Sequence, residues 1–60
     1  MNTVMITGAT DGIGRETARK LAQRNYSIII HGRNRTKAAK VKQELEEINN
    51  QADHYLAIAD

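Results

Sequence analysis

The sequence contains no cysteine, no tryptophan and no phenylalanine, and its aromatic residues are two tyrosines. Without cysteine, neither a disulfide framework nor a cysteine-based zinc site can form. A core must therefore be built from aliphatic side chains. Hydrophobic residues make up 40% of the chain, which argues against a disordered tail. A chain of this length forms one small domain at most, and such a domain buries roughly 60% of its unfolded surface.

Long hydrophobic runs are also missing. No segment approaches the roughly 20 apolar residues of a membrane span. The chain does not open on a basic segment followed by an apolar one, as a secretory signal would. These features predict a soluble protein of the cytoplasm that does not bind membranes.

The charges are unevenly distributed although the net charge is only +2. All nine lysines and arginines lie between Arg15 and Lys42, whereas five of the seven acidic residues lie at Glu44 or later. A basic segment of this kind can attract nucleic acid. However, it lacks a base-stacking platform of several aromatic residues. We therefore expect a small anionic ligand and no nucleic acid.

Three glycines between Thr7 and Gly14 separate two different periodicities. The β-branched and apolar run before them is typical of a buried strand, and the segment after them is a strong helix former. A helix that restarts after such a turn presents unpaired backbone N–H groups, which favour a phosphate. An ordinary strand-to-helix turn without a ligand is the alternative.

Each glycine has a separate expected role in the phosphate-binding interpretation. Gly8 permits a tight exit from the strand, Gly12 lets the backbone approach an anion, and Gly14 lets the helix pack closely against the sheet. Thr10 and Asp11 add polar groups to the same loop. The loop therefore predicts a nucleotide site rather than a simple turn.

The whole chain alternates between strand and helix patterns. We expect strands over residues 3–7, 27–30 and 54–59, and helices from residue 12 or 13 to 24 and over 35–49. Helical connections imply parallel pairing and right-handed crossovers. The predicted fold is therefore an incomplete α/β structure, a Rossmann-like βαβαβ half of a doubly wound parallel sheet.

The expected strand order 3-2-1 places both helices on one face of the sheet, yet the strands are apolar on both faces. Parallel sheets are normally covered on both sides. We therefore expect the open face to be covered by the remainder of its own fold or by another chain.

Helix patterns predict which residues are buried and where each helix ends. Asn25 suits a left-handed C-terminal cap, and Asn34 suits an N-terminal cap. The expected buried faces of the two helices are Ile13, Thr17, Ala18, Leu21 and Ala22 in the first, and Ala38, Val41, Leu45 and Ile48 in the second.

The segment Thr7-Gly8-x-x-x-Gly12-Ile13-Gly14 resembles the signature of the short-chain dehydrogenase/reductase family. The resemblance covers the whole chain and implies a nicotinamide-dependent oxidoreductase. It further implies that the loop from Gly8 to Gly14 wraps the pyrophosphate and adenosine ribose, with the Ile13 N–H as a phosphate donor. Residues 1–60 would then be the N-terminal part of one NADP-binding Rossmann domain, without an internal boundary.

The end of the second strand indicates which dinucleotide is bound. NAD-binding proteins place an acid there to accept hydrogen bonds from the ribose hydroxyls. Here that position is Gly32, and Arg33 follows it. A guanidinium can bind a 2′-phosphate in a bidentate manner, so we expect NADP(H). The alternative is an exposed loop arginine. Asn34 either shares the phosphate or only caps the next helix.

Asp60 ends the third predicted strand. In the family that the chain resembles, an acid at this place hydrogen-bonds the adenine amino group. An exposed terminal acid without such a role is the alternative.

The family's catalytic serine and Tyr-x-x-x-Lys have no counterpart in these residues, because Tyr26 leads to Ile30 and Tyr55 to Ala59. We therefore assign no catalytic residue and expect the chain to supply only the cofactor-binding segment of an NADP-dependent oxidoreductase. The alternative is a truncated, non-enzymatic chain that binds nucleotide weakly or docks onto another protein through its sheet.

The remaining polar residues are expected at the surface. His31 and His54 are interpreted as strand-end surface residues, and no metal site is expected. Arg15 is either a surface residue or a support for the phosphate charge. Lys40 and Glu44 are expected to form a weak pair one helical turn apart.

Overall fold

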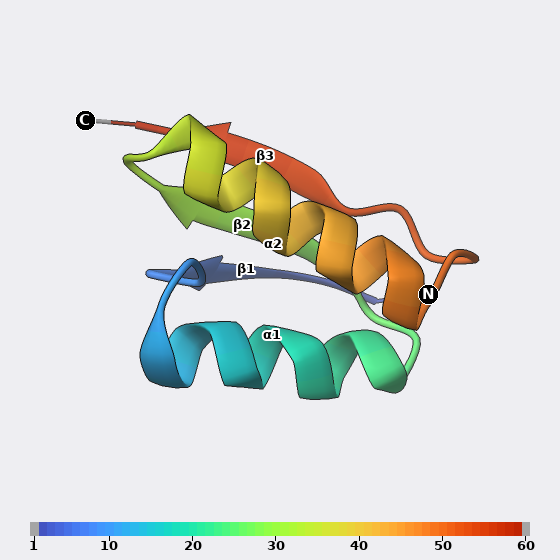
Figure 1. The fold of residues 1–60 in the computed structure, drawn as a ribbon. Helices are drawn as coiled ribbons and strands as arrows, with labels where there is room; N and C mark the ends of the chain where they lie inside the picture. Colours follow the sequence, from blue (N-terminus) through green and yellow to red (C-terminus); the bar gives the residue numbers. More distant parts are fainter. Residues whose placement is uncertain (1, 60) are drawn as a thin grey trace.

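The computed structural model describes residues 2–59 and contains every predicted strand and helix (Figure 1). The elements are β1 (Thr3–Thr7), α1 (Gly12–Gln23), β2 (Ser27–Gly32), α2 (Arg35–Ile48) and β3 (Tyr55–Ile58). The predicted bounds are therefore right to within two residues. The largest difference is at β2, which continues past its apolar run because Gly32 is still paired with Ile58 of β3.

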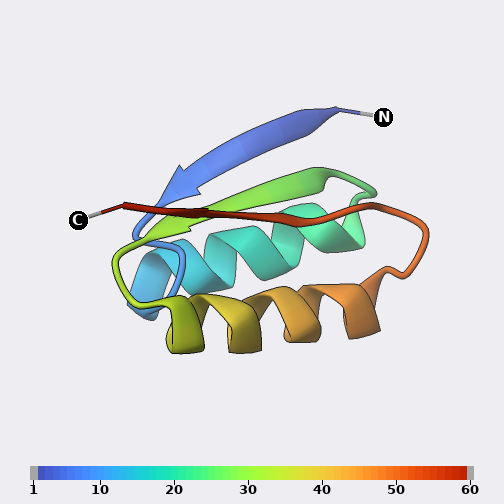
Figure 2. The ribbon, with the colours of Figure 1, turned by 90° about the horizontal axis from the view of Figure 1, so that it is seen from above.

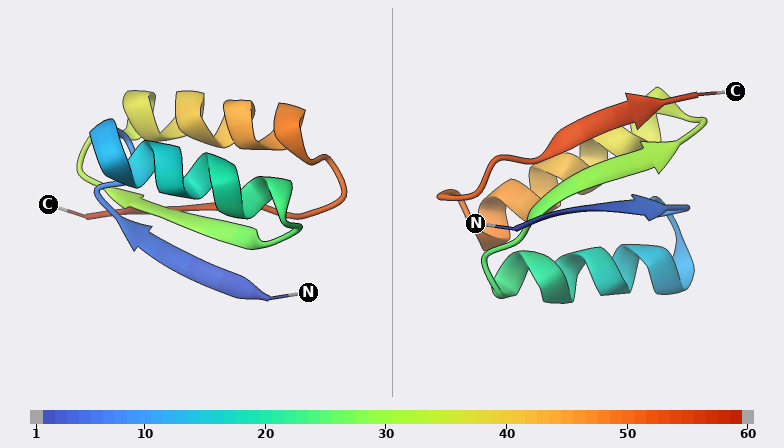
Figure 3. Two further views of the ribbon diagram at one scale, coloured as in Figure 1. Left: turned by 90° about the horizontal axis from the view of Figure 1, so that it is seen from below. Right: turned by 180° about the vertical axis from the view of Figure 1, so that it is seen from behind.

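The three strands form one parallel sheet in the order β1-β2-β3. Thr3 of β1 pairs with Ser27 of β2, and Ile29 of β2 pairs with Tyr55 of β3. Both helices lie on the same face of this sheet (Figures 2 and 3). The predicted Rossmann-like βαβαβ arrangement, with both helices on one side, is confirmed.

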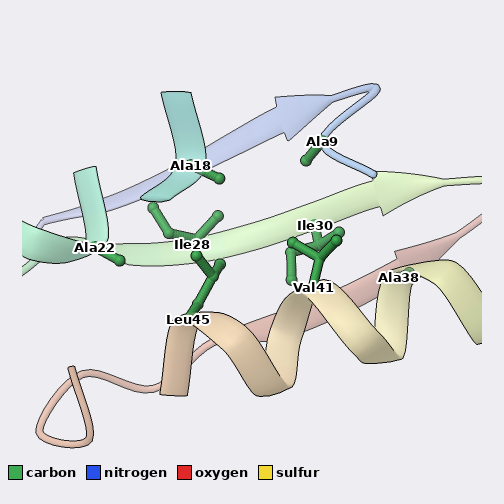
Figure 4. Packing of buried hydrophobic residues seen from close by; sticks show 8 residues of the cluster. All are labelled: Ala9, Ala18, Ala22, Ile28, Ile30, Ala38, Val41 and Leu45. Atoms are coloured by element: carbon green, nitrogen blue, oxygen red, sulfur yellow. The ribbon is translucent and has the colours of Figure 1, made fainter. Parts of the chain in front are cut away.

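The hydrophobic core lies between the central strand and the two helices (Figure 4). Ile28 and Ile30 of β2 and Leu45 of α2 are fully buried. Each such side chain contributes about 1.5–3 kcal/mol of transfer free energy. Ala18 and Ala22 of α1 face Ile28, so α1 approaches the sheet through small side chains.

The predicted buried face of α1 is partly wrong. Ile13 is 87% exposed and Thr17 is also exposed. The residues that turn toward the sheet are Gly14, Ala18 and Ala22, spaced four apart along the helix. Ile13 and Thr17 lie about 100° around the helix axis from Gly14 and Ala18. Leu21, which stands in the same relation to Ala22, is partly buried and packs against the core. In α2, by contrast, Ala38, Val41 and Leu45 are buried as predicted, and Ile48 is partly buried.

Both predicted helix caps are confirmed. Asn25 has a φ of 71°, and its N–H donates to the carbonyl oxygen of Ala22 at 3.1 Å. The Asn34 Oδ1 accepts a hydrogen bond from the backbone N–H of Lys37 at 3.0 Å. These caps satisfy backbone groups that the helix ends leave unpaired. They fix the points at which the chain leaves α1 and enters α2.

The sheet face opposite the helices carries apolar side chains. Met5, Ile29 and Tyr55 follow one another across the three strands. Met5 is 56% exposed and Tyr55 is 49% exposed. The strands are therefore apolar on both faces, as the sequence predicts.

Within residues 2–59, neither helix combines the length and the apolar character needed to cross a bilayer.

His54 is buried, so the expectation of a surface position is wrong. The residue is 3% exposed, and its Nδ1 accepts a hydrogen bond from the backbone N–H of Ile28 at 3.1 Å. The ladder between β2 and β3 begins at Ile29, one residue later. The imidazole therefore accepts the hydrogen bond of the Ile28 N–H, which lies one residue before the paired part of β2 and β3. A buried N–H of this kind is costly to leave unpaired.

We expect His54→Leu to lower the free energy of unfolding by about 1–2 kcal/mol, because the Ile28 N–H loses its acceptor while remaining buried. His54→Asn is the matched control, since its Oδ1 stands the same number of bonds from the backbone as Nδ1. Urea unfolding of both variants measures the difference. If the leucine variant is as stable as the asparagine variant, the hydrogen bond contributes nothing.

Candidate functional site

A pocket of about 510 Å³ opens at the carboxyl ends of the strands. This edge is where open parallel α/β sheets bind their ligands. Five of the residues that the sequence assigned to cofactor binding line it: Gly8, Thr10, Asp11, Arg33 and Asn34. Five others line it as well: Thr7, His31, Gly32, Lys37 and Ala59. The glycine-rich loop after β1 and the turn after β2 thus face one common space.

The glycine loop leaves open space for a ligand. Gly8 and Gly12 have φ values of 71° and 56°, a region that side-chain-bearing residues rarely adopt. Apart from the adjoining backbone, a Cβ added at either position would meet no atom within 4 Å. The backbone there is therefore bare and approachable, as a bound pyrophosphate requires.

Gly14 has the opposite environment. A Cβ built there would overlap the carbonyl oxygen of Gly8 and lie 2.9 Å from its carbonyl carbon. It would also lie 3.2 Å from the Cα of Ala9. Only glycine allows α1 to start this close to the loop that follows β1, in agreement with the close packing expected at Gly14.

The N-terminus of α1 has no side-chain cap. Asp11 occupies the capping position with extended backbone angles, but its carboxylate makes no hydrogen bond to the first turn. Instead Asp11 Oδ2 lies 3.6 Å from Lys37 Nζ and accepts a long hydrogen bond, 3.4 Å, from Thr10 Oγ1. Gly12, Ile13 and Gly14 form the first turn beside the pocket and do not line it. Their uncapped end carries the positive pole of the helix and suits an anion.

The end of β2 carries no carboxylate. Gly32 is the last residue of the strand, and a Cβ at this position would lie 3.3 Å from Thr10 Cγ2. Arg33 follows it and is exposed. Asn34 lines the pocket while its Oδ1 caps α2. The capping role is therefore observed, and the phosphate role of Asn34 stays a prediction.

Arg15 does not line the pocket, and its side chain links α1 to α2. Its Nε donates to Glu44 Oε1 at 3.0 Å, and its Nη2 pairs with Glu44 Oε2. The hydrogen bond and charge of Glu44 raise the pKa of Arg15 above its ordinary value. Glu44 is thus engaged by Arg15 and not by the expected Lys40. The pair one turn apart in α2 is Lys42 with Glu46, at 3.2 Å.

Lys37 is a pocket residue that the sequence analysis did not single out. It lies in the first turn of α2, three residues after the capping Asn34. That spacing, on the helix that follows Arg33, was the signal available in the sequence. His31 lies near the end of β2, as expected, and is partly buried where it lines the pocket. Asp60 lies outside the described residues.

Comparison with known proteins agrees with this geometry. The family model described as short chain dehydrogenase matches residues 2–59. The short chain dehydrogenase resG of Aspergillus sclerotiorum is 53% identical over 45 residues, which cover 73% of this chain and 12% of that protein.

Two solved structures superpose on the chain closely. A short chain dehydrogenase from Shigella flexneri complexed with NADP has a TM-score of 0.89 and 34% identity, covering 98% of this chain and 24% of the other. A short-chain dehydrogenase from Sphingobium yanoikuyae in complex with NADPH has a TM-score of 0.89 and 27% identity. The match covers 100% of this chain and 23% of the other. The chain therefore spans about a quarter or less of these relatives, and it belongs to the short-chain dehydrogenase family.

Proposed function

We propose that these residues form the cofactor-binding segment of an NADP-dependent oxidoreductase, as the N-terminal part of a single Rossmann domain. The observation that carries the choice of NADP is the end of β2, where Arg33 lines the pocket and no carboxylate is present. A carboxylate there would repel a 2′-phosphate, whereas a guanidinium pairs with it. Two structural relatives bound to NADP or NADPH support the same choice.

The chain's own residues hold the cofactor in this proposal. The bare backbone at Gly8 and Gly12 and the uncapped N-terminus of α1, including the Ile13 N–H, receive the pyrophosphate. Arg33 and Asn34 receive the 2′-phosphate, and Asp60 is proposed to bind the adenine amino group.

When bound, the nicotinamide carries hydride to or from a carbonyl or alcohol carbon. We assign no catalytic residue within residues 1–60. The proposed activity therefore belongs to a protein that also supplies a proton-transfer group.

The test is a comparison of NADP⁺ and NAD⁺ binding to the full chain by titration calorimetry. We expect NADP⁺ to bind at least about 10-fold more tightly, because one charge-assisted hydrogen-bonded pair contributes roughly 1.5–3 kcal/mol. Equal affinities, or tighter binding of NAD⁺, would contradict the assignment of NADP.

A further inference from the structure

We propose that Lys37 is a second determinant of 2′-phosphate recognition and that Asp11 restrains it through their ion pair. This inference rests on the proposed function, because it concerns the same pocket and the same phosphate. It concerns residues on both sides of the pocket: Asp11 belongs to the loop after β1, and Lys37 belongs to the first turn of α2.

Lys37 is held on the same side of the pocket as Arg33. Its backbone N–H is fixed by the capping bond to Asn34 Oδ1 at 3.0 Å. Arg33 comes directly after β2, and Lys37 lies four residues later in the first turn of α2. Both residues line the pocket. The first turn of α2 contains no acidic residue, so the positive helix pole and these cations are not neutralised from within the helix.

Within residues 2–59, Asp11 is the one carboxylate among the residues that line this pocket. Its Oδ2 lies 3.6 Å from Lys37 Nζ, and the two side chains are 73% and 57% exposed. An exposed pair at this separation is weak and easily exchanged for a better partner. A phosphate carrying nearly two negative charges is such a partner for the ammonium group. In exchange, Asp11 loses its cation and repels the phosphate.

The two side chains therefore act in opposite directions on the same ligand group. Lys37 favours the 2′-phosphate, while Asp11 competes for Lys37 and adds a like charge to the pocket. The position of Asp11 also explains why its carboxylate is not used as a helix cap: it pairs across the pocket and leaves the first turn of α1 uncapped.

The experiment compares 2′-phospho-ADP-ribose with ADP-ribose by titration calorimetry on the full chain. Lys37→Gln is expected to weaken the 2′-phosphorylated ligand about 5- to 10-fold and to leave ADP-ribose within about 2-fold. Asp11→Asn is expected to raise the preference for the 2′-phosphorylated ligand about 3-fold or more. This gain should become smaller when Lys37→Gln is added, because the competition for Lys37 is then absent and only the like-charge repulsion by Asp11 is relieved. Lys40→Gln is the matched control, because Lys40 lies in α2 but does not line this pocket.

The outcomes separate this inference from the proposed function. If the unmodified chain does not distinguish the two ligands, the assignment of a 2′-phosphate site to this pocket is wrong. If it does distinguish them but Lys37→Gln leaves the ratio unchanged, only the role of Lys37 is overturned. The same conclusion follows if Lys37→Gln weakens both ligands equally, or if Lys40→Gln has the same effect. Circular dichroism of each variant establishes that it is folded.

Discussion

Replacing Arg33 by aspartate is expected to turn a preference for NADP⁺ into a preference for NAD⁺. The substitution removes the guanidinium that pairs with the 2′-phosphate and places a carboxylate in the same pocket. The carboxylate repels the phosphate and accepts hydrogen bonds from the ribose hydroxyls of NAD⁺. The loss of the ion pair with the 2′-phosphate and the added repulsion together change the ratio of the NADP⁺ and NAD⁺ affinities by about 100- to 1000-fold.

Calorimetric titration of both dinucleotides measures this ratio. Arg35→Asp is the matched control, because it makes the same change of charge at the first residue of α2 without lining the pocket. A general electrostatic effect would shift both variants alike. The role assigned to Arg33 is wrong if Arg33→Asp leaves the ratio of the NADP⁺ and NAD⁺ affinities unchanged. It is also wrong if Arg35→Asp changes this ratio by the same amount.

Gly14→Ala should destabilise the fold by about 2–3 kcal/mol, as overpacking against a backbone does. Glycine to alanine within a helix ordinarily stabilises it by up to about 1 kcal/mol, so the expected sign is reversed here. The reason is steric. The new methyl group would overlap the Gly8 carbonyl, whose carbon would lie 2.9 Å away, and backbone cannot rotate aside as a side chain can.

Gly12→Ala separates this steric effect from backbone strain. Gly12 has a φ of 56°, but a Cβ added there would enter open space, so alanine costs only about 1–2 kcal/mol of strain. Urea unfolding of the two variants and the unmodified chain gives the comparison. A rise in the unfolding midpoint of Gly14→Ala would show that α1 can move away from the loop without cost.

The arrangement of the elements could be predicted because it depends on local signals. Apolar runs, helical spacing and capping residues determine where β1, α1 and α2 begin and end, and the structure confirms the caps at Asn25 and Asn34. Once the strands take the order 3-2-1 expected of a Rossmann half, the handedness of the crossovers places both helices on one face of the sheet. Of the site, the glycine loop and the turn after β2 could be found in the same way, because each adjoins a predicted strand end.

What could not be predicted depends on contacts between distant segments. The buried His54 accepts a hydrogen bond from the Ile28 N–H, a contact between distant segments that no local pattern of residues reveals. Glu44 pairs with Arg15 of the other helix rather than with Lys40 of its own. The approach of Lys37 to Asp11 likewise depends on how α2 is placed beside the loop after β1. Each of these is a tertiary contact between elements that the sequence separates.

The central position of β2 also bears on how the chain folds. Each parallel pairing closes a loop that contains a single helix, and the two loops are of similar length. The entropy lost on closing a loop grows only slowly with its length, so neither closure is strongly favoured to occur first. Either β1 or β3 can therefore join β2 at the outset, and β2 takes part in both routes to the native state.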